Sequence, residues 1–124
     1  PLLERISRIS QEEQKKPNIF LQVKFKADPN KGGFLKKDLL KSWPEIISFN
    51  NIHLKGLMTI PPIAVTSHQR KDLFFECRTL SNHLGLKDCS MGMSNDWEEA
   101  IERGATWIRL GSLLFGKRKT SEIV

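Results

Sequence analysis

The chain has 124 residues, 39% of them hydrophobic, and a formal net charge of +6. This length allows a modest core but excludes a complete (β/α)8 barrel, which takes about 250 residues. Because no apolar run approaches the roughly 20 residues that cross a bilayer and no signal peptide is visible, we expect a soluble, cytoplasmic protein.

The cysteines, histidines and basic residues disfavour two further classes of protein, those that bind metals and those that bind nucleic acids. Cys77 and Cys89 have no CxxC spacing, so we expect reduced, part-buried thiols. Two cysteines and three scattered histidines predict no metal site. Lysines and arginines are dispersed, which favours a solvated basic surface over a nucleic-acid interface.

Helical and strand patterns alternate along the chain. It opens at Pro1 rather than at a methionine, inside a helical pattern, so we expect a fragment or a C-terminal portion of a longer protein. Pro44 is expected to bend or split the second helix, and Trp43 to lie in the core. The alternation predicts a parallel sheet with right-handed crossovers. The predicted elements are helices at 1–12, 35–47 and 67–84, strands at 18–25, 52–60 and 89–91, and a turn-rich loop at 28–34.

The stretch 87–116 predicts a β-turn-α-turn-β unit. Its helix is expected to begin near residue 94 or 95, with Asn95 as N-cap and Glu98 completing a capping box. Gly104 would end this helix. The β-rich run 106–110 follows directly and predicts another strand.

Both strands of this unit end in a glycine followed by a hydroxyl residue, Gly92-Met93-Ser94 and Gly111-Ser112. Free N–H groups at such turns can hold a phosphate. Arg109, in an otherwise apolar strand, is costly to bury unless something receives it. The spacing alone leaves two interpretations open: an anion site, or an Arg109 paired with an acidic neighbour beside glycines that only shape turns.

A family resemblance bears on this choice. The run SMGMSNDWEEAIERGATWIRLGSLLFG resembles the C-terminal signature of the pyridoxal-phosphate homeostasis proteins, whose barrel is shared with the N-terminal domain of alanine racemases. Residues 56–61 and 31–33 match in order, and the resemblance extends from the first helix to Lys119. It implies an α/β fold in which residues 1–124 are one domain. Four βα-type units would form about half of a (β/α)8 TIM barrel, the C-terminal half, with a parallel sheet.

The resemblance also implies a role for each site residue. Ser94 would receive the phosphate of pyridoxal 5'-phosphate, and the Gly111 N–H with the Ser112 hydroxyl would complete the cup. Arg109 would lie beside the pyridine nitrogen. The family's Schiff-base lysine lies on a first barrel strand that this chain lacks. Neither Lys24 nor Lys26 matches that lysine, so we assign both to the surface or the pocket rim.

The resemblance implies a non-catalytic protein that binds pyridoxal 5'-phosphate and serves cofactor homeostasis, although an arginine beside the pyridine nitrogen suits a racemase equally well. A racemase would need a second acid/base, commonly a tyrosine, and the sequence contains none. Two alternatives stay open: a phosphate-binding TIM-barrel enzyme, such as a fold-type III amino-acid racemase fragment, and a basic nucleic-acid interaction module. An isolated half barrel is expected to self-associate or to pair with the missing N-terminal half.

Overall fold

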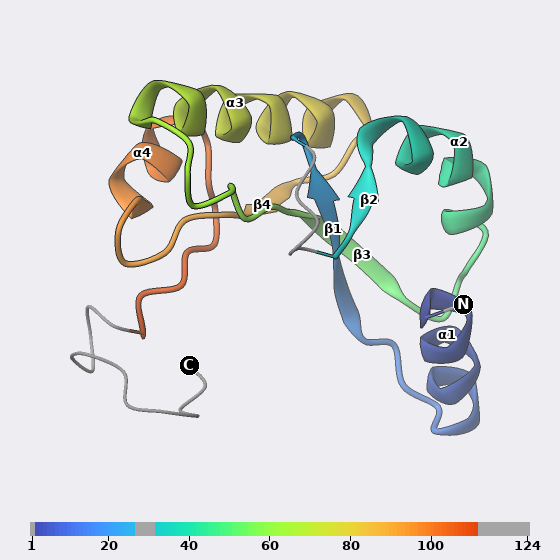
Figure 1. Ribbon diagram of the computed structural model, residues 1–124. Helices are drawn as coiled ribbons and strands as arrows, with labels where there is room; N and C mark the ends of the chain where they lie inside the picture. Colours follow the sequence, from blue (N-terminus) through green and yellow to red (C-terminus); the bar gives the residue numbers. More distant parts are fainter. Residues whose placement is uncertain (1, 27–31, 112–124) are drawn as a thin grey trace.

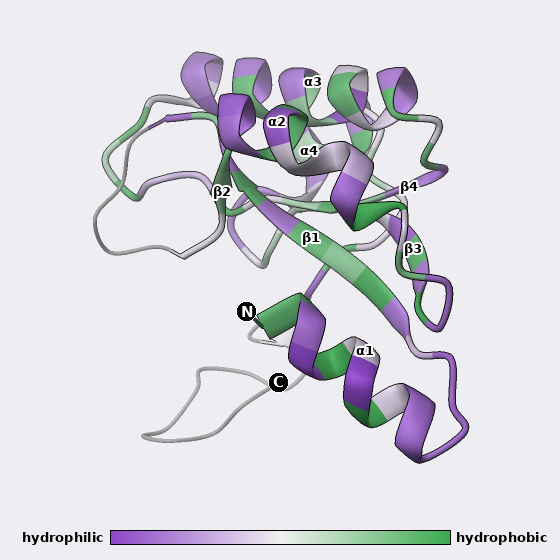
Figure 2. Cartoon of the chain, turned by 90° about the vertical axis from the view of Figure 1, so that its right-hand side faces the viewer, coloured by the Kyte–Doolittle hydropathy of each residue, from purple (hydrophilic) through white to green (hydrophobic). Residues whose placement is uncertain are grey.

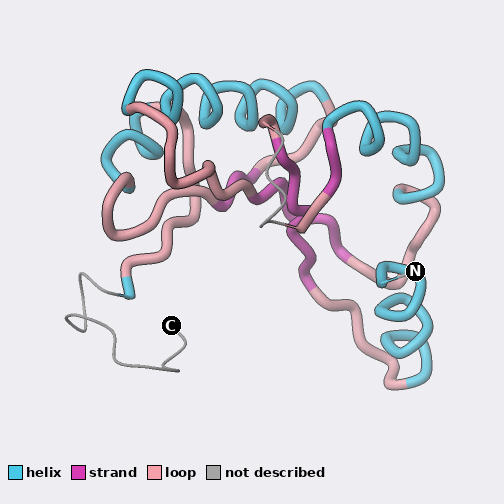
Figure 3. Tube along the Cα trace, in the orientation of Figure 1, coloured by secondary structure: helices cyan, strands magenta, loops and turns pink. Residues whose placement is uncertain are grey.

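The computed structural model describes residues 2–26 and 32–111, and within them four parallel strands form one sheet in the spatial order β2-β1-β3-β4 (Figures 1 and 3). In chain order the elements are α1 (Leu2–Glu12), β1 (Asn18–Lys24), β2 (Phe34–Leu35), α2 (Lys36–Ile46), β3 (His53–Met58), α3 (Ser67–His83), β4 (Asp88–Ser90) and α4 (Trp97–Glu102). The α/β fold with a parallel sheet agrees with the prediction. None of the described helices is both long and apolar enough to cross a membrane.

Three helices cover one face of the sheet. Helices α2, α3 and α4 lie on one side, whereas α1 lies on the other side near the start of β1 (Figure 2). The α1 helix is tied to the loop before β3 by the Asn51 amide, which donates to the Ser7 carbonyl. The core forms where the apolar face of the sheet meets the apolar sides of α2 and α3. Its buried members include Leu21, Val23, Leu57 and Cys89 from the strands and Leu39, Phe74, Cys77 and Leu80 from the helices.

The parallel register brings the carboxyl ends of β3 and β4 to the same edge. Leu57 of β3 pairs with Cys89 of β4, and Met58 pairs with Ser90. Just past β3, the Thr59 hydroxyl donates to the Val23 carbonyl at 2.8 Å, which extends the contact with β1. The chain that follows β3 therefore lies beside the chain that follows β4.

Two features around α2 differ from the sequence prediction. Helix α2 continues through Pro44 to Ile46 and is not split, because the proline lies close to the helix end and removes only one late hydrogen bond. Residues 34 and 35, predicted as loop and helix start, form β2 by pairing with Val23 and Lys24. Trp43 is partly buried against the core, as predicted.

The last unit also departs from the prediction. Run 106–110 contributes only one bridge, between Ser90 and Trp107, instead of a full strand. In a regular parallel ladder the next bond would join the Arg109 N–H to the Met91 carbonyl. Gly92 instead has φ +104, which turns the chain, and Arg109 donates to the Gly92 carbonyl at 2.9 Å. The segment still lies alongside β4, but the ladder ends after one bridge.

Candidate functional site

A cavity of about 420 Å³ lies between the chain that follows β3 and the chain that follows β4. We call it the strand-end hollow; residues 59–63, Arg70 and residues 92–96 line it. Ser94 is half-buried in its wall. Ligands of parallel α/β sheets bind at this edge, outside the carboxyl ends of the strands. The strand-end hollow is therefore the candidate site.

Turn 92–96 gives the hollow one wall, and it requires glycine at its start. A Cβ at Gly92 would lie 2.7 Å from the Ala100 Cβ and 3.2 Å from the Trp97 Cα. Asp96 closes the turn, because its Oδ1 accepts from the Met93 N–H at 2.7 Å. These two constraints fix the backbone that carries Ser94.

The predicted capping of the following helix is wrong. Helix α4 begins at Trp97 with Asp96 as N-cap, and no side chain forms a cap hydrogen bond there. Asn95 lies within the turn, so it cannot form the predicted capping box with Glu98. Asp96, which takes the N-cap position instead, forms no cap hydrogen bond because its carboxylate already accepts from the Met93 N–H within the turn.

Arg109 is held next to this turn and carries donors without acceptors. Its Nε and Nη2 atoms are buried, and neither has a hydrogen-bond partner in the described part of the chain. The alternative of an acidic partner for Arg109 finds no support among residues 2–26 and 32–111, which provide no ion pair to it. An unsatisfied buried donor costs about 1–3 kcal/mol. A ligand that places an acceptor atom next to these nitrogens would remove this cost.

The remaining predicted site residues are only partly placed. Gly111 is half-buried and is the last described residue, and Ser112 lies outside the described residues. The lining of the strand-end hollow includes Ser94 but neither Arg109 nor Gly111. The 2.9 Å hydrogen bond between Arg109 and Gly92 nevertheless joins the two segments that carry Ser94 and Arg109.

Arg70 is a lining residue that sequence reasoning missed. A capping box between Thr66 and Gln69 starts α3 and places Arg70 in its first turn. The guanidinium donates to Glu99 through Nε at 3.2 Å and through Nη2 at 2.8 Å, and its Nη1 donates to the Val65 carbonyl at 3.2 Å. The hydrogen bond from Arg70 is the main cause that lowers the pKa of Glu99, and the same bond raises the pKa of Arg70. No periodicity links residues 29 positions apart, so no local sequence pattern indicates this pair.

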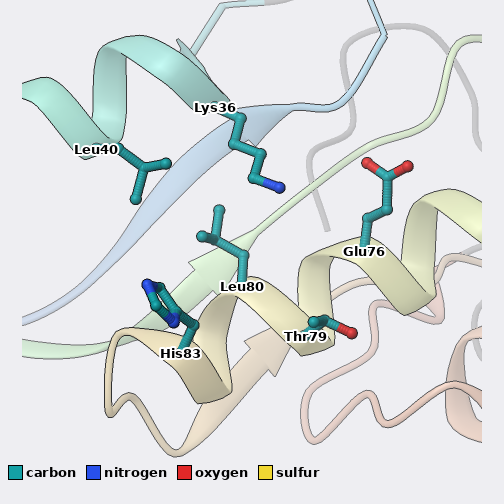
Figure 4. Close-up of a pocket in the computed structure, with 6 residues that line it drawn as sticks. All are labelled: Lys36, Leu40, Glu76, Thr79, Leu80 and His83. Atoms are coloured by element: carbon teal, nitrogen blue, oxygen red, sulfur yellow. The ribbon is translucent and has the colours of Figure 1, made fainter.

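Two other cavities lie away from the strand-end hollow. Lys24 and Lys26 line a cavity of about 250 Å³ together with Lys36 and Lys37, so both lysines lie at a different place from Ser94. Figure 4 shows the second, a cavity of about 360 Å³ between α2 and α3. It is lined by Lys36, Leu40, Glu76, Thr79, Leu80 and His83. All six belong to α2 and α3, and none of them lines the strand-end hollow.

The two thiols belong to the core. Cys77 and Cys89 are free and fully buried, rather than part-buried as predicted. The Cys89 Sγ lies 3.8 Å from the Cys77 carbonyl. The hydrogen bond with Cys89 and burial raise the pKa of the Cys77 thiol. These thiols support packing between α3 and β4.

The sequence and the fold place this chain in a known family. Residues 2–119 match the family model of the alanine racemase N-terminal domain, and the chain belongs to this family. It is 39% identical over 120 residues to the pyridoxal phosphate homeostasis protein of Synechocystis sp., covering 92% of this chain and 55% of that protein. The chain thus spans about half the length of this relative.

Solved structures of a similar protein match most of this chain. PipY of Synechococcus elongatus PCC7942, solved without PLP, is 40% identical with a TM-score of 0.89, and the match covers 93% of this chain and 57% of PipY. The same protein solved with PLP bound is 38% identical with a TM-score of 0.87, over 93% and 56% of the two chains. The predicted family is confirmed, and so is the predicted α/β fold with a parallel sheet.

Proposed function

We propose that this chain is part of a pyridoxal-phosphate homeostasis protein, that it binds the cofactor without catalysing a reaction on it, and that it supplies the phosphate-binding half of the site. The observation that carries the proposal is the pair of buried Arg109 nitrogens beside the strand-end hollow, which have no hydrogen-bond partner among residues 2–26 and 32–111. A bound acceptor would relieve their cost. The similar PipY, solved with PLP bound, supports this choice of ligand.

Each residue has a distinct role in this proposal. The Ser94 hydroxyl and the Gly111 N–H would receive the phosphate, together with Ser112, and Arg109 would lie beside the pyridine nitrogen. Bound pyridoxal phosphate supplies an electron-withdrawing ring. A guanidinium beside the ring nitrogen disfavours protonation of that nitrogen and so weakens the electron withdrawal. This arrangement suits a protein that carries the cofactor.

We extend the proposal to the domain. Residues 1–124 would be the C-terminal half of a TIM barrel. Support comes from the parallel sheet, whose strand ends share one edge, and from the match to about half of each relative. The face of the sheet away from α2–α4 would then meet the other half of the barrel or a second copy of the chain. Size-exclusion chromatography with light scattering tests this: a monodisperse monomer in dilute solution would contradict it.

A fluorescence titration tests cofactor binding. The chain is titrated with pyridoxal phosphate while tryptophan emission is followed, because Trp107 is half-exposed on the segment that carries Arg109. Inorganic phosphate serves as competitor, and Ser94→Ala as the site variant. Ser48→Ala is the matched control, because Ser48 is an exposed serine that bonds only to Glu45, at the end of α2.

The expected result is saturable quenching that phosphate reverses and that Ser94→Ala weakens, with Ser48→Ala unchanged. Absence of quenching, or equal quenching in both serine variants, would overturn the proposed half-site. Tighter binding of sugar phosphates than of pyridoxal phosphate would instead support the alternative of a phosphate-binding barrel enzyme.

A further inference from the structure

One side chain connects both walls of the strand-end hollow. Arg70 donates to the Val65 carbonyl, in the chain that follows β3, and to the Glu99 carboxylate on α4, directly after turn 92–96. Figure 1 shows the start of α3 beside α4, where this bridge lies. The separation of the walls therefore depends on the length and the planar shape of a guanidinium.

The bridge has a defined geometry and little exposure. Arg70 and Glu99 side chains are 25% and 18% exposed, and two guanidinium nitrogens each meet one carboxylate oxygen. A bidentate arginine–carboxylate pair fixes orientation as well as distance. Asp96 adds a favourable charge interaction that also raises the pKa of Arg70. Since Asp96 also closes the turn, the same carboxylate interacts with the Arg70 charge and with the Met93 N–H of the turn.

A second ion pair between the same helices offers a comparison. Lys71 and Glu102 lie 3.5 Å apart, with exposures of 32% and 62%. Neither residue lines the strand-end hollow, and this pair has a single contact. It joins α3 to α4 without reaching the wall that follows β3. Both residues also line a neighbouring cavity with residues 94–96, so the Lys71–Glu102 pair controls for losing a cation near the turn as well as a contact between the two helices.

We propose that Arg70 is a positioning residue: it holds the two walls of the strand-end hollow at a fixed separation and thereby sets the affinity of the site for a phosphate group. This inference rests on the proposed function only for the identity of the ligand. Arg70 itself acts through Glu99 and Val65. Because Nε and Nη2 are used by Glu99, the charge of Arg70 is largely compensated before any ligand arrives.

The test uses the full chain with Arg70→Met, Arg70→Lys and the control Lys71→Met. Dissociation constants are measured for pyridoxal phosphate, inorganic phosphate and pyridoxal, which lacks the phosphate. Arg70→Met is expected to weaken binding of the two phosphate ligands about tenfold, a change of about 1.4 kcal/mol, and to leave pyridoxal unchanged, because the turn that carries Ser94 loses its fixed position. Arg70→Lys keeps the charge without the planar fork, so it should recover part of the loss.

Amide hydrogen exchange over residues 92–96 gives a readout that needs no ligand. Arg70→Met is expected to speed this exchange, and Lys71→Met to leave it unchanged. Equal exchange rates in the unmodified chain and in Arg70→Met would overturn the positioning role, even if the unmodified chain binds pyridoxal phosphate. Faster exchange in a chain that binds no pyridoxal phosphate would support the positioning role while overturning the proposed function. Equal weakening for pyridoxal and the phosphate ligands would indicate general destabilisation and would contradict the inference.

Discussion

The Arg109 N–H donates to the Gly92 carbonyl at 2.9 Å, and this hydrogen bond helps to join the two segments that carry the predicted site residues. It replaces the bond that a regular parallel ladder would make to Met91. The departure from regular pairing follows from the positive φ of Gly92. A glycine needed for the turn therefore also determines where the arginine lies.

Gly92→Ala is expected to lower the free energy of unfolding by about 2–4 kcal/mol, since it adds a clash to a strained backbone conformation. The new Cβ would meet Ala100 at 2.7 Å. Gly85→Ala is the matched control, because Gly85 has φ +74 but no atom within 4 Å of an added Cβ. It should cost only about 1–2 kcal/mol. Urea denaturation measures both, and equal losses would contradict the packing argument.

Arg109→Met is expected to separate stability from binding. Removing buried donors that have no acceptor in the described part of the chain should raise the free energy of unfolding by about 1 kcal/mol, while binding of pyridoxal phosphate falls. Calorimetric titration and chemical denaturation measure the two effects. Arg78→Met is the control, because Arg78 donates to Asn82 and to the carbonyls of three further residues and should be stabilising. A less stable Arg109→Met variant with unchanged binding would refute the assigned role.

Stability should fall in acid through Glu99. Its pKa is lower in the folded chain than the usual value of about 4.3, chiefly because of the hydrogen bond from Arg70. A lowered carboxyl pKa stabilises the fold above the unfolded-state value, and this contribution is lost as the pH falls through the lowered folded-state value. Glu99→Gln should flatten the profile of unfolding free energy below about pH 4.3. An unchanged acid limb in this variant would show that the pair has no such role.

The two thiols should be protected in the folded chain. Cys77 and Cys89 are fully buried, and a raised pKa keeps the Cys77 thiol protonated. The hydrogen bond with Cys77 lowers the pKa of Cys89 to about 7, so burial alone protects the Cys89 thiol. A thiol reagent such as dithionitrobenzoate should therefore react slowly with the native chain and with both thiols once urea unfolds it. Rapid reaction of either thiol without denaturant would show that the contact between α3 and β4 opens easily.

Local sequence patterns correctly predicted the helices and strands in which apolar residues repeat at a regular spacing. Helix α3 was correctly placed because its apolar residues repeat at helical spacing and Gly85 follows its end. Strand β2 could not be predicted, because two residues have no periodicity and only pairing with β1 makes them a strand. The N-cap of α4 was predicted one residue too early, at Asn95 instead of Asp96, because Asn95 lies inside a turn that the Asp96 side chain closes.

The candidate site was predicted only in part, and the roles of its residues stay predictions. The glycine and hydroxyl pattern pointed to Ser94, which lines the strand-end hollow. Arg70 was missed because its role depends on Glu99 and on the Val65 carbonyl, which come together only in the folded chain. Tertiary ion pairs of this kind leave no local sequence pattern.

The sheet order has a consequence for how the chain folds. Strand β1 pairs with β3, and its first residue, Asn18, meets His53 across 35 positions of sequence. Such a contact requires a long segment to lose its freedom before any pairing energy is gained, whereas α3 can form from neighbours along the chain. We therefore expect helix formation to precede sheet assembly. The carboxyl edge of the sheet, and the ligand site on it, would be among the last parts of the molecule to acquire their shape.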